Sequence, residues 1–186
     1  MSEPTLPDKI LDIHHALANA SISHAFGGAL ALAYYAEPRA TDDIDINVFL
    51  APNDFPRIQL ALQPLGVDTQ VDPAAVQRDG QCRLSWTRTP IDVFLAYDQI
   101  HQAMRKQTRI VPFGDQRIPI LGPEHLLACK VVFDRPKDWL DIEQMLVCVE
   151  DLDMPDIQHW LHRILGAEDP RHARLDQLAQ TASESR

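Results

Sequence analysis

The sequence predicts an α/β fold of the α+β type, in which a small mixed β-sheet with flanking helices precedes a C-terminal bundle of helices. Short apolar or alternating segments that suit strands are confined to residues 23–121. From residue 122 onward, apolar residues recur three and four positions apart, as in amphipathic helices. Gly122-Pro123 separates the two patterns, so the predicted domains are residues 1–121, a core that contains the sheet, and residues 122–186, a helical region.

Composition limits the classes of function. The chain has 186 residues and 45% apolar content, which is enough for a hydrophobic core. Its net charge of -10 excludes a protein coated in positive charge, so a nucleic-acid contact would need a local basic patch. The three cysteines lack CxxC spacing, the N-terminus does not have the pattern of a targeting segment, and no apolar run reaches roughly 20 residues. We therefore expect a cytoplasmic protein without a membrane span.

The N-terminal elements follow from periodicity and from breaking residues. In chain order we expect a helix over 6–20, a strand over 23–26, a glycine turn at 27–28 and a helix over 29–37 that Pro38 stops. The segment "DIDINVFL" alternates before it becomes wholly apolar. This pattern predicts a strand that is buried on one face and open to a site on the other.

The remaining elements are predicted in the same way. They are a helix bracketed by Pro52, Pro56 and Pro64, strands over 82–89 and 91–97 with a break at Pro90, a helix over 98–107, and strands over 109–113 and 117–121. Beyond the boundary, apolar spacing predicts helices over 122–134, 137–150 and 155–165.

Asp43 and Asp45 are the first candidates for a functional site. Residues two apart in a strand point to the same face, so the two carboxylates would lie side by side while Ile44 and Ile46 pack behind them. Like charges at that distance repel one another unless a cation lies between them, and Mg²⁺ prefers oxygen ligands. The alternative interpretation of "TDDID" is an acidic turn that leads into a strand.

Asp92 and the glycine pair add to this candidate site. Asp92 is a lone carboxylate in another apolar strand, where Asp is rare unless it is paired or bound to a metal. Asp92 is therefore the candidate third metal ligand, after Asp43 and Asp45. Gly27 and Gly28 at the start of a helix would let backbone N–H groups approach a phosphate, helped by the helix dipole. A tight turn is the alternative interpretation of the glycines.

Together these features resemble the DNA polymerase β-like nucleotidyltransferase superfamily. The pattern of that superfamily is hydrophobic-Gly-Gly/Ser, followed by Asp-hydrophobic-Asp/Glu-hydrophobic and a later carboxylate. The matching residues here are Phe-Gly-Gly at 26–28, Asp-Ile-Asp-Ile at 43–46, and Asp92. The resemblance implies transfer of a nucleoside monophosphate from an NTP, such as ATP, to an acceptor hydroxyl with release of pyrophosphate. It also implies Mg²⁺, or Mn²⁺ in its place, bound by Asp43, Asp45 and Asp92. The residues assigned to nucleotide binding in this part of the chain are Gly27, Gly28 and Thr41.

The segment "GPEHLLACKVVFDRPKDWLDIEQML" resembles the helical half of the AbiEii/MenT-type toxin nucleotidyltransferases. In that family a helix carries a Lys, and an Arg and an Asp-rich helix start follow it. The corresponding residues here are Lys130, Arg135, Asp138 and Asp141. The resemblance implies that Lys130 contacts nucleotide phosphates, that Asp138 helps to bind the nucleotide and that Asp141 is catalytic, with the choice between the two aspartates left open. Helix capping by Asp138, with charge pairs on an exposed face, is the alternative.

Three functions fit these observations. The toxin resemblance favours transfer to the 3′ end of tRNA or another RNA, and it implies a cognate antitoxin protein as partner. A small-molecule nucleotidyltransferase acting on aminoglycoside- or lincosamide-type antibiotics is the alternative, because an acidic protein attracts a cationic acceptor. A non-catalytic nucleotide-binding domain is disfavoured by the three intact aspartates. The basic residues available to an RNA are Arg83, Arg88, Arg105, Lys106, Arg109 and Arg117.

Overall fold

A computed structural model of the chain describes residues 3–184, which form two compact units. The first unit contains the chain up to Leu30 together with Ala40–Leu121. The second contains Ala31–Arg39 and the chain from Gly122 onward. Residues 31–39 therefore group with the C-terminal helices, although they lie within the N-terminal half of the sequence.

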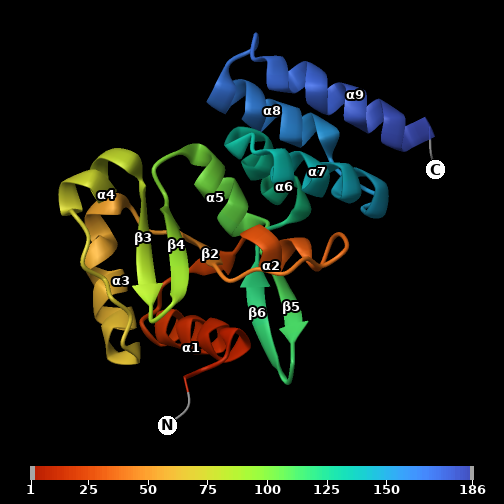
Figure 1. Cartoon of the computed structure of the whole chain (residues 1–186). Coiled ribbons are helices and arrows are strands. Elements are labelled where there is room, and N and C mark those ends of the chain that lie inside the picture. The colour runs from red at the N-terminus through yellow and green to blue at the C-terminus, as the bar shows by residue number, and fades with distance from the viewer. Residues whose placement is uncertain (1–2, 185–186) are drawn as a thin grey trace. The chain divides into compact units, whose positions relative to one another are not determined.

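The first unit is built on a six-stranded mixed sheet with the strand order β3-β4-β2-β1-β6-β5 (Figure 1). The strands are β1 (His24–Phe26), β2 (Ile44–Val48), β3 (Gln81–Trp86), β4 (Thr89–Leu95), β5 (Arg109–Phe113) and β6 (Gln116–Ile120). β2 runs parallel to β4, and β1 runs parallel to β6, whereas the other neighbouring pairs are antiparallel. The predicted α/β fold with a small mixed sheet is confirmed.

The helices of the first unit are short apart from the first. They are α1 (Leu6–Asn19), α3 (Phe55–Leu62), α4 (Pro73–Asp79) and α5 (Gln99–Lys106), with 3₁₀ turns at Pro52–Asp54 and Gln63–Leu65. α1 is capped by Thr5, whose side chain forms a reciprocal capping box with Asp8. The sequence analysis missed α4, because this helix has a single buried residue, Val76, and therefore shows no apolar period.

Two predicted boundaries differ from the structure. The helix after the glycine pair, α2 (Gly28–Leu32), is much shorter than residues 29–37, because turns at Tyr34 and Tyr35 follow it and bond back to Ala31 and Leu32. Pro90 lies inside β4, opposite Ser85 of β3, and does not break the strands. β2 pairs with β4 only from Ile91 onward, so the missing N–H of Pro90 removes no bond between these two strands.

The sheet has one apolar face and one face that carries carboxylates. Ile44 and Ile46 of β2 and Ile91 of β4 are buried, and alternation directs Asp45 and Asp92 to the opposite face. α1 lies on the apolar side, because the Lys9 ammonium is 5.7 Å from the ring centre of Trp86, which shares a face with these isoleucines through the β3–β4 register. The carboxylates therefore lie on the side of the sheet away from α1.

The second unit contains α6 (Pro123–Phe133), α7 (Pro136–Cys148), α8 (Met154–Leu165) and α9 (Pro170–Glu184). α6 packs against α7 and α8, and α7 packs against α9. Their contacts bury Leu127, Ile142, Met145, Ile157 and Leu175. Within residues 3–184, none of the helices is long and apolar enough to cross a membrane.

Candidate active site

Strand register brings two of the predicted site residues side by side. Asp45 of β2 is paired with Asp92 of β4, and Asp92 is paired with Arg83 of β3 on its other side. Residues paired across neighbouring strands point to the same face of a sheet. Arg83, Asp92 and Asp45 therefore form a row across three strands on the face away from α1.

The glycine turn lies at the end of this row. The N–H of Gly27 donates a hydrogen bond of 2.9 Å to the backbone oxygen of Asp45. Gly28 has φ +52°, and a Cβ atom added there would overlap the Asp45 carboxylate. Glycine is therefore required at position 28 both for its backbone conformation and for the close approach of Asp45. Because α2 begins here and has five residues, its dipole is weaker than the longer predicted helix would have supplied.

Asp43 lies immediately before β2, which begins at Ile44. The hydroxyl of Thr41 makes a short hydrogen bond to Asp43 Oδ1, and it also receives a bond of 3.4 Å from the Asp43 N–H. Thr41, assigned to nucleotide binding from the sequence, therefore orients the Asp43 carboxylate in the structure. Its contact with a nucleotide stays a prediction.

Arg83 is the cation of the carboxylate row. Its Nε and Nη2 atoms donate to the two oxygens of Asp92, each at 2.7 Å. These hydrogen bonds, with the charge of Asp92 and then the charges of Asp43 and Asp45, raise the pKa of Arg83. The sequence analysis placed Arg83 only among basic residues for RNA, because its partner is revealed by strand pairing and not by spacing.

The donor set fits a hard divalent cation by its chemistry. Asp43, Asp45 and Asp92 offer only carboxylate oxygens, the ligands that Mg²⁺ and Mn²⁺ favour. Within residues 3–184, however, no three Asp, Glu, His or Cys side chains are grouped closely enough to hold a metal as they stand. The guanidinium of Arg83 neutralises Asp92 in this arrangement. The metal assignment of the three aspartates stays a prediction.

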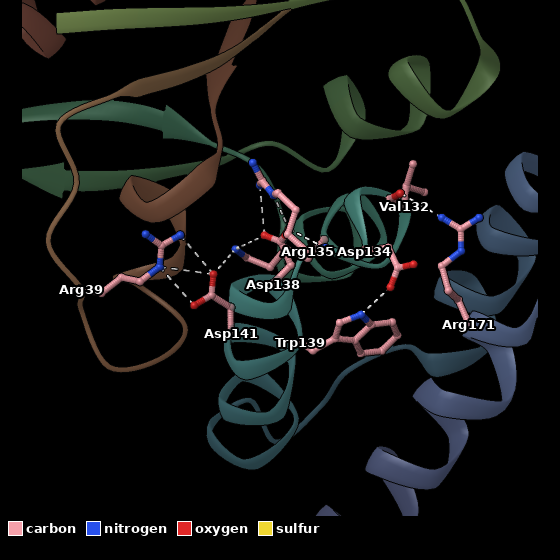
Figure 2. A network of polar contacts seen from close by, with 9 residues as sticks. Arg39, Val132, Asp134, Arg135, Asp138, Trp139, Asp141 and Arg171 are labelled. Atoms are coloured by element: carbon pink, nitrogen blue, oxygen red, sulfur yellow. Dashed lines mark hydrogen bonds and ion pairs between the residues drawn. The ribbon is translucent and has the colours of Figure 1, made fainter.

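The other predicted site residues form a buried ion network in the second unit (Figure 2). The Lys130 ammonium lies 2.6 Å from Asp141 Oδ2 and 3.9 Å from Asp138 Oδ1. Arg39 binds Asp141 with N–O distances from 3.2 Å, and Arg135 binds Asp138 at 2.6 Å. Both candidate aspartates therefore contact the same lysine, and Asp141 does so more closely.

The network is largely removed from solvent. Lys130 is 3% exposed, and Asp138 is fully buried. Asp138 also accepts a bond from the Arg135 N–H at the start of α7, so the capping interpretation is correct in geometry, although the carboxylate does not lie on an exposed face. Arg39 was missed, since a single Arg after Pro38 carries no periodic signal. A nucleotide contact by Lys130 stays a prediction.

The basic residues considered for RNA do not form one cluster along the sheet. Arg83 and Arg88 belong to the β3–β4 hairpin at one edge, whereas Arg109 and Arg117 belong to β5 and β6 at the other. The two groups are close in sequence but separated in space, because α5 connects β4, beside one edge of the sheet, to β5 at the other edge. Arg105 and Lys106 lie in the last turn of α5 and are exposed.

Comparison with solved structures finds a similar fold in several nucleotidyltransferases. The crystal structure of ANT(2″)-Ia in complex with adenylyl-2″-tobramycin matches with a TM-score of 0.57 at 13% identity, over 98% of this chain and 99% of that one. The lincosamide antibiotic adenylyltransferase LnuA, bound to lincomycin, matches with a TM-score of 0.55 at 14% identity, over 77% of this chain and 98% of that one. The solution structure of the antibiotic-resistance factor ANT(2″)-Ia matches with a TM-score of 0.53 at 15% identity, over 95% and 90%.

The similarity to these proteins is in structure and not in sequence. No protein-family model matches the sequence, and no curated protein does. At identities between 13% and 15%, the shared property is the course of the backbone. The chain therefore shares the fold of these nucleotidyltransferase structures.

Proposed function

We propose that this chain is a metal-dependent nucleotidyltransferase that moves a nucleoside monophosphate from an NTP to an acceptor hydroxyl and releases pyrophosphate. The observation that carries the proposal is the register that sets Asp45 beside Asp92, with Gly28 against the Asp45 carboxylate. The nucleotidyltransferase fold agrees with it. Carboxylates on one sheet face beside a glycine turn are the groups that metal-assisted transfer to a hydroxyl requires.

The residues have distinct roles in this proposal. Asp43, Asp45 and Asp92 would hold Mg²⁺ or Mn²⁺, whose charge would neutralise the triphosphate and acidify the acceptor hydroxyl. Asp92 would also accept the hydroxyl proton, a role that a carboxylate beside the acceptor can perform. Thr41 would keep Asp43 oriented, and Gly28 would leave the space that the Asp45 carboxylate occupies.

A small cationic molecule is the acceptor that we favour. The matched structures include a lincosamide antibiotic adenylyltransferase and an enzyme with an adenylylated tobramycin. The net charge of -10 would attract a cationic acceptor and repel a polyanion. The separation of the basic residues between two sheet edges also weakens the case for an RNA-binding surface.

An RNA 3′ end is the second candidate. It is supported by Arg105, Lys106 and Arg109, which are exposed and follow one another closely from α5 into β5. With an RNA acceptor, a toxin role and restraint by a cognate antitoxin would follow from the resemblance of the helical segment.

The test is a transfer assay with α-labelled NTPs and Mg²⁺. Wild-type protein, Asp45→Asn, Asp92→Asn and the matched control Asp42→Asn, which alters an exposed neighbour, are each incubated with tobramycin, lincomycin or total tRNA. We expect label on a small molecule with wild type and Asp42→Asn only. Label on tRNA alone would establish the second candidate, and full activity in Asp45→Asn would contradict the site.

A further inference from the structure

Arg83 makes a contact in the carboxylate row that competes directly with a metal for Asp92. Its guanidinium binds both oxygens of Asp92 at 2.7 Å, so the lone pairs that a cation would use are engaged on both sides of that carboxylate. Arg83 lies directly opposite Asp92 in the strand register, which aligns the two groups without bending either strand.

The Arg83 side chain has room to move away from Asp92. β3 is an edge strand, and the Arg83 side chain is 66% exposed, whereas that of Asp92 is 19% exposed. Rotation of the arginine side chain would therefore move it into solvent, while the shorter and less exposed aspartate stays in place. An ion pair with one exposed partner is weakly stabilising, so a divalent cation is able to displace it.

We propose that Arg83 is a positioning residue that orients Asp92 in the metal-free protein and competes with a divalent cation for that carboxylate. This inference rests on the proposed function, because it takes Asp92 as a metal ligand. The guanidinium neutralises part of the charge of Asp43, Asp45 and Asp92, which all act on it electrostatically. A divalent cation replaces it with a larger charge at the same carboxylates.

The competition should not change between pH 7 and pH 9. Arginine stays protonated throughout the range in which proteins fold, so deprotonation never removes the competing charge. Displacement is then the only way to free Asp92. The gain in metal affinity upon removal of Arg83 should be the same at pH 7 and pH 9.

The experiment measures Mn²⁺ binding by titration calorimetry, without nucleotide. Arg83→Gln should bind Mn²⁺ about two- to five-fold more tightly than wild type, the range that corresponds to an exposed ion pair. Arg88→Gln is the matched control, because it makes the same charge change in the same hairpin at a side chain that is 94% exposed. It should leave the affinity unchanged. Arg83→Lys, which keeps the charge but loses the two-pronged geometry, should lie between the two.

Two further measurements separate positioning from general stabilisation. In an Asp92→Asn background, Arg83→Gln should raise Mn²⁺ affinity much less than it does with Asp92 present, and an equal gain in the two backgrounds would overturn the assignment to Asp92. The melting temperature of Arg83→Gln should be lower than that of wild type without metal and equal to it in saturating Mn²⁺. A lower melting temperature of Arg83→Gln that persists in saturating Mn²⁺ would also contradict the proposal, since it would indicate that Arg83 only stabilises the fold.

Failure of this inference differs from failure of the proposed function. Equal Mn²⁺ affinity in wild type and Arg83→Gln would overturn the competition while leaving the metal site intact. Absence of Mn²⁺ binding in both proteins would overturn the metal site itself, and the competition with it.

Discussion

At the scale of single residues, the candidate site depends on how closely the backbone at Gly28 approaches Asp45. The Asp45 carboxylate occupies the space that a Cβ at position 28 would need, and the left-handed backbone there also disfavours a side chain. Gly27 is less restricted, because its added Cβ would lie 3.2 Å from its nearest neighbour, Asn47 Nδ2, whereas the Cβ at position 28 would overlap Asp45 Oδ2. The position of one carboxylate is therefore controlled by the absence of one methyl group.

Gly28→Ala should reduce nucleotidyl transfer by about 100-fold, because displacement of a reacting group by an ångström has an effect of that order. The control is Gly114→Ala, which has φ +58° and open space around its Cβ. Both variants carry the backbone penalty of about 1–2 kcal/mol, but only Gly28→Ala moves Asp45. Transfer rates and unfolding free energies of the two variants are compared. Equal loss of activity in both would show that backbone strain, and not displacement of Asp45, is responsible.

At the scale of elements, buried polar contacts connect pieces of chain that are distant in sequence. The Lys130–Asp141 pair connects α6 to α7, and Arg39 adds residues 31–39 to the same network. In the first unit, His14 of α1 contacts His24 of β1, with 2.9 Å between Nδ1 and Nε2. Each of these contacts is made by groups that are costly to bury without a partner.

Asp141→Asn should lower the free energy of unfolding by about 3–5 kcal/mol, because it leaves the buried ammonium of Lys130 without its nearest charge. The control is Asp79→Asn, which breaks the exposed pair with Arg78 and should change stability by less than about 1 kcal/mol. Urea unfolding measures both. The double variant Lys130→Met/Asp141→Leu should be more stable than Asp141→Asn, and an equal or larger loss would contradict the explanation by an unpaired charge.

His24 should make stability depend on pH. Burial is the main cause that lowers the pKa of His24 from 6.5 to about 4. Between those values the unfolded chain binds a proton that the folded chain does not, so stability is complete above pH 6.5 and falls as pH decreases to about 4, by at most about 3 kcal/mol. Unfolding free energies at several pH values should show a shallower slope for His24→Asn. The exposed His159 is the control, and His159→Asn should keep the wild-type slope.

At the scale of the whole molecule, charge favours one kind of acceptor over another. The net charge of -10 produces a field that draws cations and repels polyanions at low ionic strength. The exposed basic residues at the end of α5 are a local exception to it. The acceptor therefore has a measurable electrostatic signature.

If the acceptor is a cationic small molecule, its KM should rise several-fold between about 50 and 300 mM salt, because salt screens the attraction. The double variant Arg105→Glu/Lys106→Glu should keep or improve this KM, since it makes the protein more negative. An RNA acceptor would also bind more weakly in salt, but the same double variant would then lose most of its transfer activity. Steady-state kinetics with tobramycin and with tRNA distinguish the two cases.

Much of the fold could be predicted from local patterns. α1 follows from apolar residues at helical spacing, and β2 follows from alternation after Asp43. The two aspartates at 43 and 45 and the glycine pair were recognisable because their spacing lies within a short segment. Periodicity and capping depend on residues that are near one another in the chain, so the sequence shows them directly.

Only the tertiary structure decided which distant residues meet. That Asp92 lies between Asp45 and Arg83 depends on the order of β3, β4 and β2, which no local pattern specifies. The burial of Lys130 and its link to Arg39 likewise depend on the packing of residues 31–39 with the C-terminal helices. Strand order and helix packing are non-local, because they minimise the exposed apolar surface of the whole chain. The residues of the candidate site could thus be predicted from the sequence, whereas their partners in the structure required the fold.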